Sequence, residues 1–215
     1  MSLDPESSAD VDAAPPPELL ARAYLAGAFP MADSATGEIG WYSPDPRAVQ
    51  PFVAGDPLGS FRVRRSLAKR VRNAGYTVTR STAFAEVIAA CAQPRPQEPE
   101  TWISPALRDS YVQLHELGHA QSVEAWHDGQ LVGGLYGVVL GGAFFGESMF
   151  SRMPDASQVC LVHLVEHLRS RGFTLLDVQF VNPHIEQFGV VEIGRDHYLA
   201  LLEAAVELPV TWESE

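Results

Sequence analysis

The chain has 215 residues, of which 46% are hydrophobic and 20% charged, and its 15 Lys and Arg against 27 Asp and Glu give a formal net charge of −12. This length and apolar content suffice for the core of one large domain, or of one domain and a smaller one. The longest uncharged apolar run, residues 131–146, has 16 residues and six glycines, so it is too short and too flexible for a membrane span.

The first 18 residues contain five acidic residues, no Lys or Arg and no apolar segment. This composition excludes a secretory signal and predicts a disordered acidic lead-in over residues 1–16. Cys91 and Cys160 fall within apolar runs that look helical, so we interpret both as core residues of a protein in a reducing compartment. We therefore expect a cytoplasmic location.

Residues 17–57 predict a small N-terminal unit. A proline run precedes a short helical pattern that ends near Gly27, and the sequence WYSPDPR indicates a loop broken by prolines. Residues 58–215 then predict a larger second unit. It begins with a strand at FRVRR, a helix opened by Ser66 and a strand over residues 76–79.

The second unit continues as a mixture of helices and antiparallel strands. The predicted order is a helix over residues 84–91, a helix from Ser104 to Gly118, strands SVEAW, LVGGLYGVVL and AFFGESMF with turns at Asp128-Gly129 and Gly141-Gly142, a helix over residues 157–169 capped at Gly172, a strand LLDVQF and a helix around DHYLALLEAA. Neighbouring antiparallel strands mixed with helices predict an α+β fold, in which a sheet is layered with helices.

Positive charge is concentrated in one short segment. FRVRRSLAKRVRNAGY, residues 61–76, has no carboxylate and contains six cations, Arg62, Arg64, Arg65, Lys69, Arg70 and Arg72. Without them the chain has 9 cations against 27 acids, a net charge of −18. This asymmetry indicates a local anion-binding site rather than a basic protein.

The string HLVEH, residues 163–167, matches the inverted zinc-protease pattern HxxEH. On a helical wheel its apolar neighbours share one face, which leaves His163, Glu166 and His167 on the opposite, solvated face. Zinc catalysis needs its ligands in a pocket together with a third ligand, so we interpret this string as surface and expect no metal.

Gly146 to Phe150 nearly matches the GxSxG nucleophile elbow, and Ser148, Asp177 and a later histidine, His184 or His197, occur in the order used by α/β hydrolases. The last glycine is missing, and a proline-containing loop follows where the elbow needs a helix. A serine hydrolase therefore stays open only as an alternative, and a non-catalytic RNA-binding module that uses the basic segment is a second alternative.

An acetyl-CoA site needs a phosphate loop of the form Q/R-x-x-G-x-G/A. The nearest segments, QLVGGL and RSRGFT, both lack a small residue at the sixth position, where the chain must approach the pyrophosphate closely. We therefore expect no acetyl-CoA and no other cofactor.

The stretches AYLAGAFP, WYSPDPR, TWIS, LHELGHAQSVEAW, LVGGLYGV, GESMFSRMPDAS and DVQFVNPH, in this order, resemble the leucyl/phenylalanyl-tRNA protein transferases over residues 17–203. The resemblance implies transfer of Leu or Phe from aminoacyl-tRNA to proteins that begin with Arg or Lys. It also implies a small N-terminal domain followed by an acetyltransferase-like (GNAT-like) domain, without acetyl-CoA. We expect a monomer with no membrane partner.

The resemblance also assigns site residues. An aminoacyl ester is already activated, so the enzyme has to align a neutral amine with it. Asp177 and Gln179 match the positions that assist proton movement, and i, i+2 spacing on a strand places both on one face. Glu147 matches the Glu of GESMFS and is expected at the reacting end. The implied substrate-binding residues are Trp102 and Met31 at the terminal adenosine, Leu135, Phe144 and Met149 around the transferred side chain, and Ser148 and Asn182 within the matched motifs.

Some positions depart from the family pattern. Met31 stands where members usually have Trp, Gln158 stands where they have Lys, and residues 187–190 read QFGV instead of SLGA. The glycine-rich segment before the first helix is replaced by the acidic lead-in. These departures concern adenosine affinity and amino-acid preference more than the reaction itself.

Overall fold

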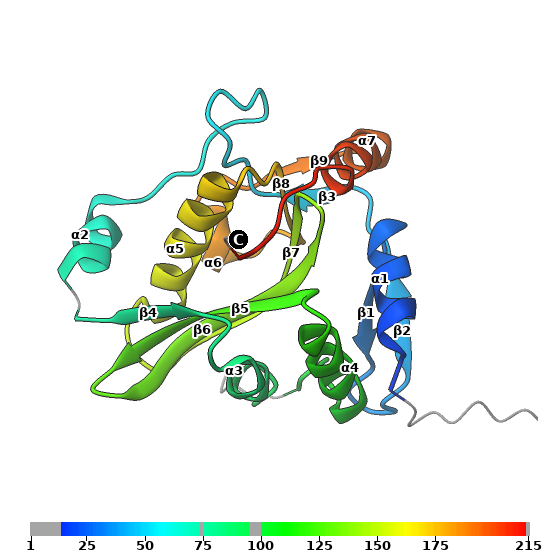
Figure 1. Ribbon diagram of the computed structural model, residues 1–215, viewed down its shortest axis with the longest axis horizontal. Coiled ribbons are helices and arrows are strands. Elements are labelled where there is room, and N and C mark those ends of the chain that lie inside the picture. The colour runs from blue at the N-terminus through cyan, green and yellow to red at the C-terminus, as the bar shows by residue number, and fades with distance from the viewer. Residues whose placement is uncertain (1–13, 74, 95–99, 214–215) are drawn as a thin grey trace, which may run out of the picture.

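The computed structural model describes residues 14–73, 75–94 and 100–213, so most of the predicted lead-in lies outside the described residues. The described chain forms helices and strands in the order α1 Pro17–Leu25, β1 Phe29–Ala32, β2 Ile39–Tyr42, β3 Arg47–Val49, α2 Arg65–Asn73, β4 Thr77–Arg80, α3 Phe84–Cys91, α4 Pro105–Glu116, β5 Ala120–His127, β6 Gln130–Leu140, β7 Ala143–Ser151, α5 Ala156–Arg171, β8 Leu175–Gln179, α6 Pro183–Glu186, β9 Val191–Ile193 and α7 Arg195–Val206 (Figure 1). The α+β fold class is confirmed.

A mixed sheet of seven strands, in the order β4-β5-β6-β7-β8-β3-β9, forms the centre of the fold. The predicted meander of β5, β6 and β7 is antiparallel, and β7 and β8 are the one parallel pair among the described strands because α5 crosses over between them. Strand β3, from the predicted N-terminal unit, is inserted between β8 and β9. The N-terminal segment therefore contributes directly to the large sheet.

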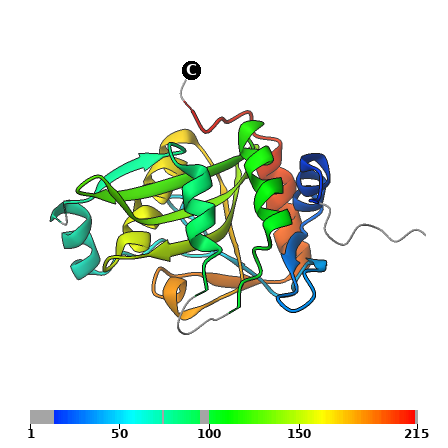
Figure 2. The ribbon, with the colours of Figure 1, turned by 90° about the horizontal axis from the view of Figure 1, so that it is seen from below.

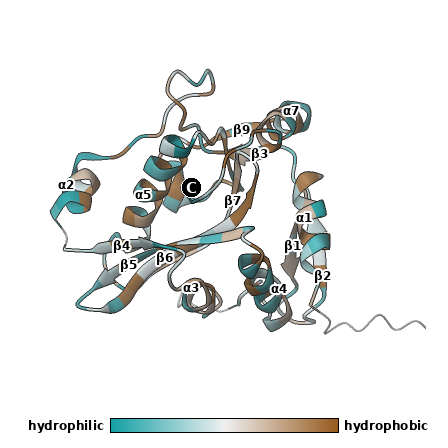
Figure 3. Ribbon diagram, viewed as in Figure 1, coloured by the Kyte–Doolittle hydropathy of each residue, from teal (hydrophilic) through white to brown (hydrophobic). Residues whose placement is uncertain are grey.

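Helices cover both faces of this sheet (Figures 1 and 2). Helix α5 packs on β5, β6 and β7 from one side, and α3 and α4 pack from the other. Two buried apolar clusters result, and Figure 3 shows hydrophobic residues along the central strand β7. Cys91 and Cys160 are buried in these two layers, as expected.

Several predicted helix ends are confirmed. The Ser104 hydroxyl accepts a hydrogen bond from the Leu107 amide at 3.2 Å and so caps α4, and Gly172 ends α5 at a φ of +81°. The strand predicted at FRVRR is wrong: residues 61–64 are irregular, and α2 begins at Arg65. The Arg62 backbone amide donates a hydrogen bond to the Phe188 carbonyl, which is not part of a neighbouring strand.

Three side chains of HLVEH lie as expected: Leu164 and Val165 are buried, and Glu166 is exposed. His167 differs from the predicted solvated face, whereas the His163 side chain is 31% exposed. His163 lies 3.7 Å from Glu166, and the His167 ring is half-buried against Trp212, whose carbonyl lies 3.0 Å from His167 Nε2. Burial, and then the Arg80 charge, lowers the pKa of His167 against the opposing effect of the hydrogen bond to the Trp212 carbonyl.

Candidate active site

A β-bulge at Glu147 determines which way the side chains of β7 point. Ser148 pairs with Tyr136 and Gly146 pairs with Gly137, so Glu147 is the extra residue. After the bulge, the side chains at odd-numbered positions of β7 point to the opposite face of the sheet. Before it, Phe145 lies in the α3/α4-side cluster; after it, Met149 lies toward α5.

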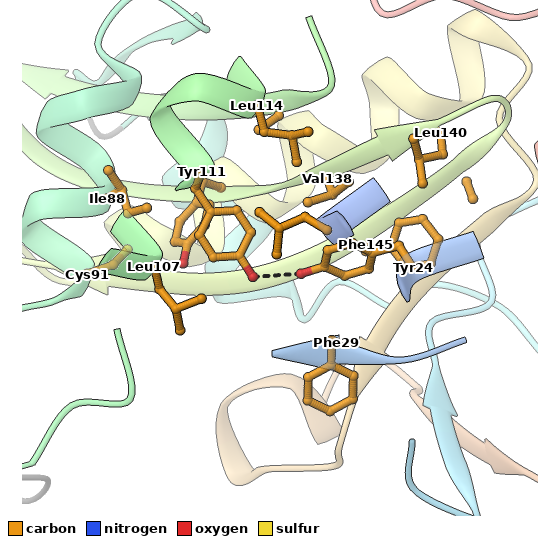
Figure 4. Close-up of a cluster of buried hydrophobic side chains, with 14 of the residues drawn as sticks. Tyr24, Phe29, Ile88, Cys91, Leu107, Tyr111, Leu114, Val138, Leu140 and Phe145 are labelled. Atoms are coloured by element: carbon orange, nitrogen blue, oxygen red, sulfur yellow. Dashed lines mark hydrogen bonds between the residues drawn. The ribbon is translucent and has the colours of Figure 1, made fainter. Parts of the chain in front are cut away.

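The Glu147 carboxylate accepts three hydrogen bonds. The Tyr24 hydroxyl lies 2.7 Å from Oε1, the Tyr111 hydroxyl 3.0 Å from Oε2, and the Gln179 side-chain amide 3.1 Å from Oε1. The two hydroxyls also lie 2.7 Å from each other (Figure 4). Burial raises the pKa of Glu147 to about 7, against the opposing effect of the tyrosine hydrogen bonds.

Asp177 is completely buried, and its carboxylate is bound by an arginine. Arg47 Nη2 lies 2.6 Å from Asp177 Oδ2, and Arg47 Nε lies 3.0 Å from Oδ1. The Tyr198 hydroxyl donates to Oδ2 at 2.7 Å. Burial, and then the Asp177 charge, raises the pKa of Tyr198. Asp177 is thus held by Arg47 and Tyr198 and does not present an open carboxylate.

Gln179 connects Asp177 to Glu147. Its backbone amide donates to Asp177 Oδ1 at 2.9 Å, while its side-chain amide reaches Glu147. Its φ of +57° is in the left-handed region, which a residue with a side chain seldom adopts. Asp177 and Gln179 both lie on β8 and both are buried, and the chain turns at Gln179, the last residue of the strand, where the Phe180 amide donates to the Val178 carbonyl.

A pocket of about 480 Å³ opens between the end of β7, the loop that follows it and the start of α5. We call it the β7–α5 pocket; its lining includes Met149, Met153, Asp155, Gln158 and His184. Of the three residues expected around the transferred side chain, only Met149 lines it among the described residues. Leu135 pairs with Met149 across the sheet, and Leu135 and Phe144 are buried in the same cluster behind it.

The two residues expected at the adenosine lie on adjacent segments. The Ala32 amide, next to Met31, donates to the Trp102 carbonyl at 3.1 Å. Both side chains are half-buried against the α3/α4-side cluster. Exposed aromatic rings lie nearby: Tyr42 pairs with Phe29 in the small sheet, and Phe180 packs edge-on against Phe29 at 5.8 Å.

The six cations of the basic segment are all exposed, as its sequence indicates. Two of them bind one acid at the edge of the β7–α5 pocket: Arg64 Nη2 lies 3.2 Å from Asp155, and Arg70 Nε lies 2.8 Å from the same carboxylate. Arg64 also donates to Gln158. Within the described part of the chain, no ion pair is found for the other four, Arg62, Arg65, Lys69 and Arg72.

Ser148 and Asn182 take ordinary structural positions. Ser148 lies inside β7, not at a turn from strand to helix, and the Asp177 that a hydrolase triad would use is bound to Arg47 and Tyr198 rather than to a histidine. Asn182 caps α6, since its side-chain oxygen accepts from the His184 and Ile185 amides.

Four residues of this network were missed from the sequence: Tyr24, Arg47, Tyr111 and Tyr198. Tyr24 and Arg47 do fall within two of the family-like stretches, AYLAGAFP and WYSPDPR, which was the only available signal. Tyr111 and Tyr198 look like ordinary core positions of amphipathic helices, because nothing in the spacing shows that their hydroxyls meet carboxylates.

Comparisons with known proteins show which family the chain belongs to. The family model for leucyl/phenylalanyl-tRNA protein transferase matches residues 57–203, and the model for the N-terminal domain of the same family matches residues 14–45. A leucyl/phenylalanyl-tRNA protein transferase from Rhizorhabdus wittichii is 52% identical over 191 residues, covering 88% of this chain and 75% of the relative. One from Novosphingobium aromaticivorans is 53% identical over 191 residues, covering 88% and 70%.

A solved structure, a ribosomal-protein-alanine N-acetyltransferase from Brucella melitensis biovar Abortus, covers 52% of this chain and 84% of its own, with 16% identity and a TM-score of 0.36. This match concerns the fold alone. The family models cover most of the chain, and the two relatives are similar over nearly all of its described length. The chain therefore belongs to the leucyl/phenylalanyl-tRNA protein transferase family.

Proposed function

We propose that this chain transfers Leu or Phe from the ester of an aminoacyl-tRNA to the α-amine of proteins that begin with Arg or Lys. Family membership supports an aminoacyl-tRNA donor and a protein acceptor. The observation that carries the reaction is Glu147, a carboxylate with a pKa of about 7 on a bulge, held by two tyrosine hydroxyls and the Gln179 amide.

Glu147 suits the proton transfer that ester aminolysis needs. An α-amine has a pKa of about 7.7 to 8.0, so a useful fraction is neutral near pH 7 and can attack the ester carbon. As the C–N bond forms, the nitrogen loses a proton to the Glu147 carboxylate. That proton then passes to the ribose oxygen as the C–O bond breaks, so Glu147 returns to its ionised form. A base with a pKa close to the working pH is the most effective for this role.

Asp177 and Gln179 act beside Glu147 but differently from each other. Gln179 reaches Glu147 with its side-chain amide and can orient either that carboxylate or the incoming amine. Asp177 is buried and already fully bonded, so it serves the reaction by holding Gln179 rather than by taking a proton itself. The negative charge of Glu147 is also suited to an acceptor whose first residue is cationic.

The donor is placed by the remaining candidate residues. The β7–α5 pocket is large enough for a Leu or Phe side chain, with Met149 as an adaptable wall. Trp102 and Met31, which lie on adjacent segments, would contact the terminal adenosine. The basic segment would bind phosphates of the acceptor stem; Arg65, Lys69 and Arg72 are better suited than Arg64 and Arg70, whose charge is partly neutralised by Asp155.

We further propose that the protein acts as a cytoplasmic monomer, with residues 17–57 and 58–215 as its two units joined through β3. Among the helices of the described segments, none is both long enough and apolar enough to cross a membrane.

The test is a direct transfer assay. Charged leucyl-tRNA or phenylalanyl-tRNA is incubated with a peptide that begins with Arg, and mass spectrometry measures the added residue. A peptide that is identical except for an initial Ser is the control for acceptor choice. Addition to the Arg peptide alone supports the proposal. Hydrolysis of the ester without transfer, together with labelling by a fluorophosphonate, would instead favour a serine hydrolase.

A further inference from the structure

Arg47 is a buried arginine whose guanidinium is fixed from several sides. Its side chain is 1% exposed. Nε and Nη2 bind the two oxygens of Asp177, and Nη1 donates to the Gly27 carbonyl at 3.0 Å. The guanidinium also lies between two rings, 4.7 Å from the centre of Phe29 and 4.6 Å from that of Tyr198. A planar fork that binds both oxygens and stacks on rings is specific to arginine.

The ion pair controls a strained point of the backbone. The Asp177 oxygen that accepts from Arg47 Nε also accepts from the Gln179 backbone amide at 2.9 Å. That bond holds Gln179 at its unfavourable φ of +57°. The same residue sends its side-chain amide to Glu147. Contacts therefore run without a break from Arg47 through Asp177 and Gln179 to the Glu147 carboxylate.

Arg47 comes from a part of the chain that neither family match covers, since residues 46–56 lie between the two matched ranges. It begins β3, which pairs with β8 beside Asp177. Because β3 is three residues long and is inserted between strands far away in sequence, its position depends on contacts such as this ion pair. The N-terminal segment thus completes the catalytic network.

We propose that Arg47 is a positioning residue for the transfer reaction: it holds Asp177 so that the left-handed turn at Gln179 keeps the Gln179 amide on Glu147. The inference rests on the proposed function. Arg47 touches none of the groups proposed to react, so its loss should reduce turnover and leave the binding of the charged tRNA nearly unchanged. A purely structural role would instead reduce the amount of folded protein without changing the turnover of the molecules that fold.

The first test is Arg47→Lys, which keeps the charge but removes the fork. We expect kcat to fall about 10- to 100-fold, the effect of a small misplacement at the reacting groups, with the tRNA KM within about twofold of wild type. Arg195→Lys is the matched control, because Arg195 is exposed and pairs with Asp45 at 3.7 Å in the same part of the molecule. It should leave both constants unchanged.

The second test separates positioning from stability. Arg47→Met combined with Asp177→Leu replaces the buried ion pair by apolar side chains, which proteins often tolerate without loss of stability. We expect this double variant to melt near the wild-type temperature and yet keep the low kcat, because Gln179 has lost its anchor. Concentrations of folded enzyme are matched by circular dichroism before each assay.

The outcomes are distinct. A wild-type protein that fails to transfer an amino acid overturns the proposed function. An active wild type with normal kcat in Arg47→Lys, or with kcat restored in the double variant, overturns the positioning role. Failure of both variants to fold would also overturn it, since Arg47 would then act on folding alone.

Discussion

Glu147 is the residue whose ionisation sets the working pH of the proposed reaction. Its side chain is only partly exposed, and burial raises its pKa to about 7 because the charged form loses hydration. The neighbouring Asp177 charge raises the pKa further, whereas the two tyrosine hydroxyls and Arg47 favour the carboxylate. The result is a carboxylate that changes charge in the range where an α-amine also loses its proton.

The first prediction concerns this titration. Since the reaction needs Glu147 ionised, kcat should rise with pH through about 7 and fall as the carboxylate is protonated at lower pH. Glu147→Gln keeps the shape but cannot take a proton, so kcat should fall by roughly 10²- to 10⁴-fold. The step in the profile near pH 7 should disappear, and only the rise that comes from deprotonation of the acceptor α-amine, at about 7.7 to 8.0, should remain. Single-turnover rates with prebound charged tRNA, measured from pH 5.5 to about 8.5, test this. A variant that retains the wild-type profile would remove Glu147 from the reaction.

The second prediction concerns stability. A group whose pKa is raised in the folded state stabilises the fold fully below its unfolded pKa of 4.5, and this contribution is lost as the pH rises through about 7. Glu147→Gln removes the buried charge, so the variant should be more stable than wild type at pH 8 by about 1 to 3 kcal/mol, a shift of one pKa unit being about 1.4 kcal/mol. The difference should shrink as the pH approaches 4.5. Urea denaturation at both pH values measures it, and a constant difference would contradict the assignment of the titration to Glu147.

Among the elements, the hairpin of β6 and β7 contributes most to the site because its bulge points Glu147 toward Tyr24 and Tyr111. The bulge needs space on the opposite strand. A Cβ atom on Gly137 would overlap the Phe145 carbonyl oxygen and the Phe144 ring. On its cross-strand partner Gly146, a Cβ would meet only the Asp177 carbonyl oxygen, at an ordinary 3.5 Å.

The third prediction uses this pair of glycines. Gly137→Ala should destabilise the protein by about 1 to 3 kcal/mol, the usual effect of overpacking a tight core, because both contacting groups are held by the sheet. Gly146→Ala should change stability by less than about 0.5 kcal/mol. Thermal denaturation of the two variants gives the comparison. Equal melting temperatures would mean that the bulge can shift without penalty and does not fix the direction of Glu147.

How much the sequence could predict depends on whether an element is defined by local pattern. The meander, α3, α4, α5 and α7 carry clear periodicity and turn residues, and their positions follow from the sequence. Strand β3 has only three residues, and its partners β8 and β9 follow it by more than 120 residues, so no local pattern indicates it. The ion pair of Arg47 with Asp177 depends on that same distant pairing. The bulge at Glu147 has a different cause: the two strands of this hairpin follow from local pattern, but the pattern does not show where their register shifts by one residue.

Over the whole molecule, positive charge gathers at one end. Helix α2 lies at the opposite end of the long axis from α1 in both views (Figures 1 and 2). Figure 3 shows hydrophilic residues along α2. This helix packs on α5, and its residue Leu67 is buried. An acidic body with one basic end should repel a polyanion everywhere except there, so we expect the basic segment both to bind the tRNA and to orient it on approach.

The fourth prediction tests this role with two pairs of substitutions that change the net charge equally. Lys69→Ala with Arg72→Ala removes two exposed cations of α2 and leaves the contacts of Arg64 and Arg70 with Asp155 intact, so the β7–α5 pocket should keep its shape. The tRNA KM should rise, and the slope of log KM against log salt should flatten by about one to two units, because two fewer phosphate contacts release fewer counterions.

Arg22→Ala with Arg108→Ala, on α1 and α4, is the control and should change neither value. A short aminoacyl-adenosine donor, which lacks the stem, should be used equally well by both double variants and by wild type. If the α2 variant instead lost activity equally with the short donor, the damage would lie in the reaction centre. If the control pair raised the tRNA KM as strongly as the α2 pair, net charge rather than the basic segment would govern binding.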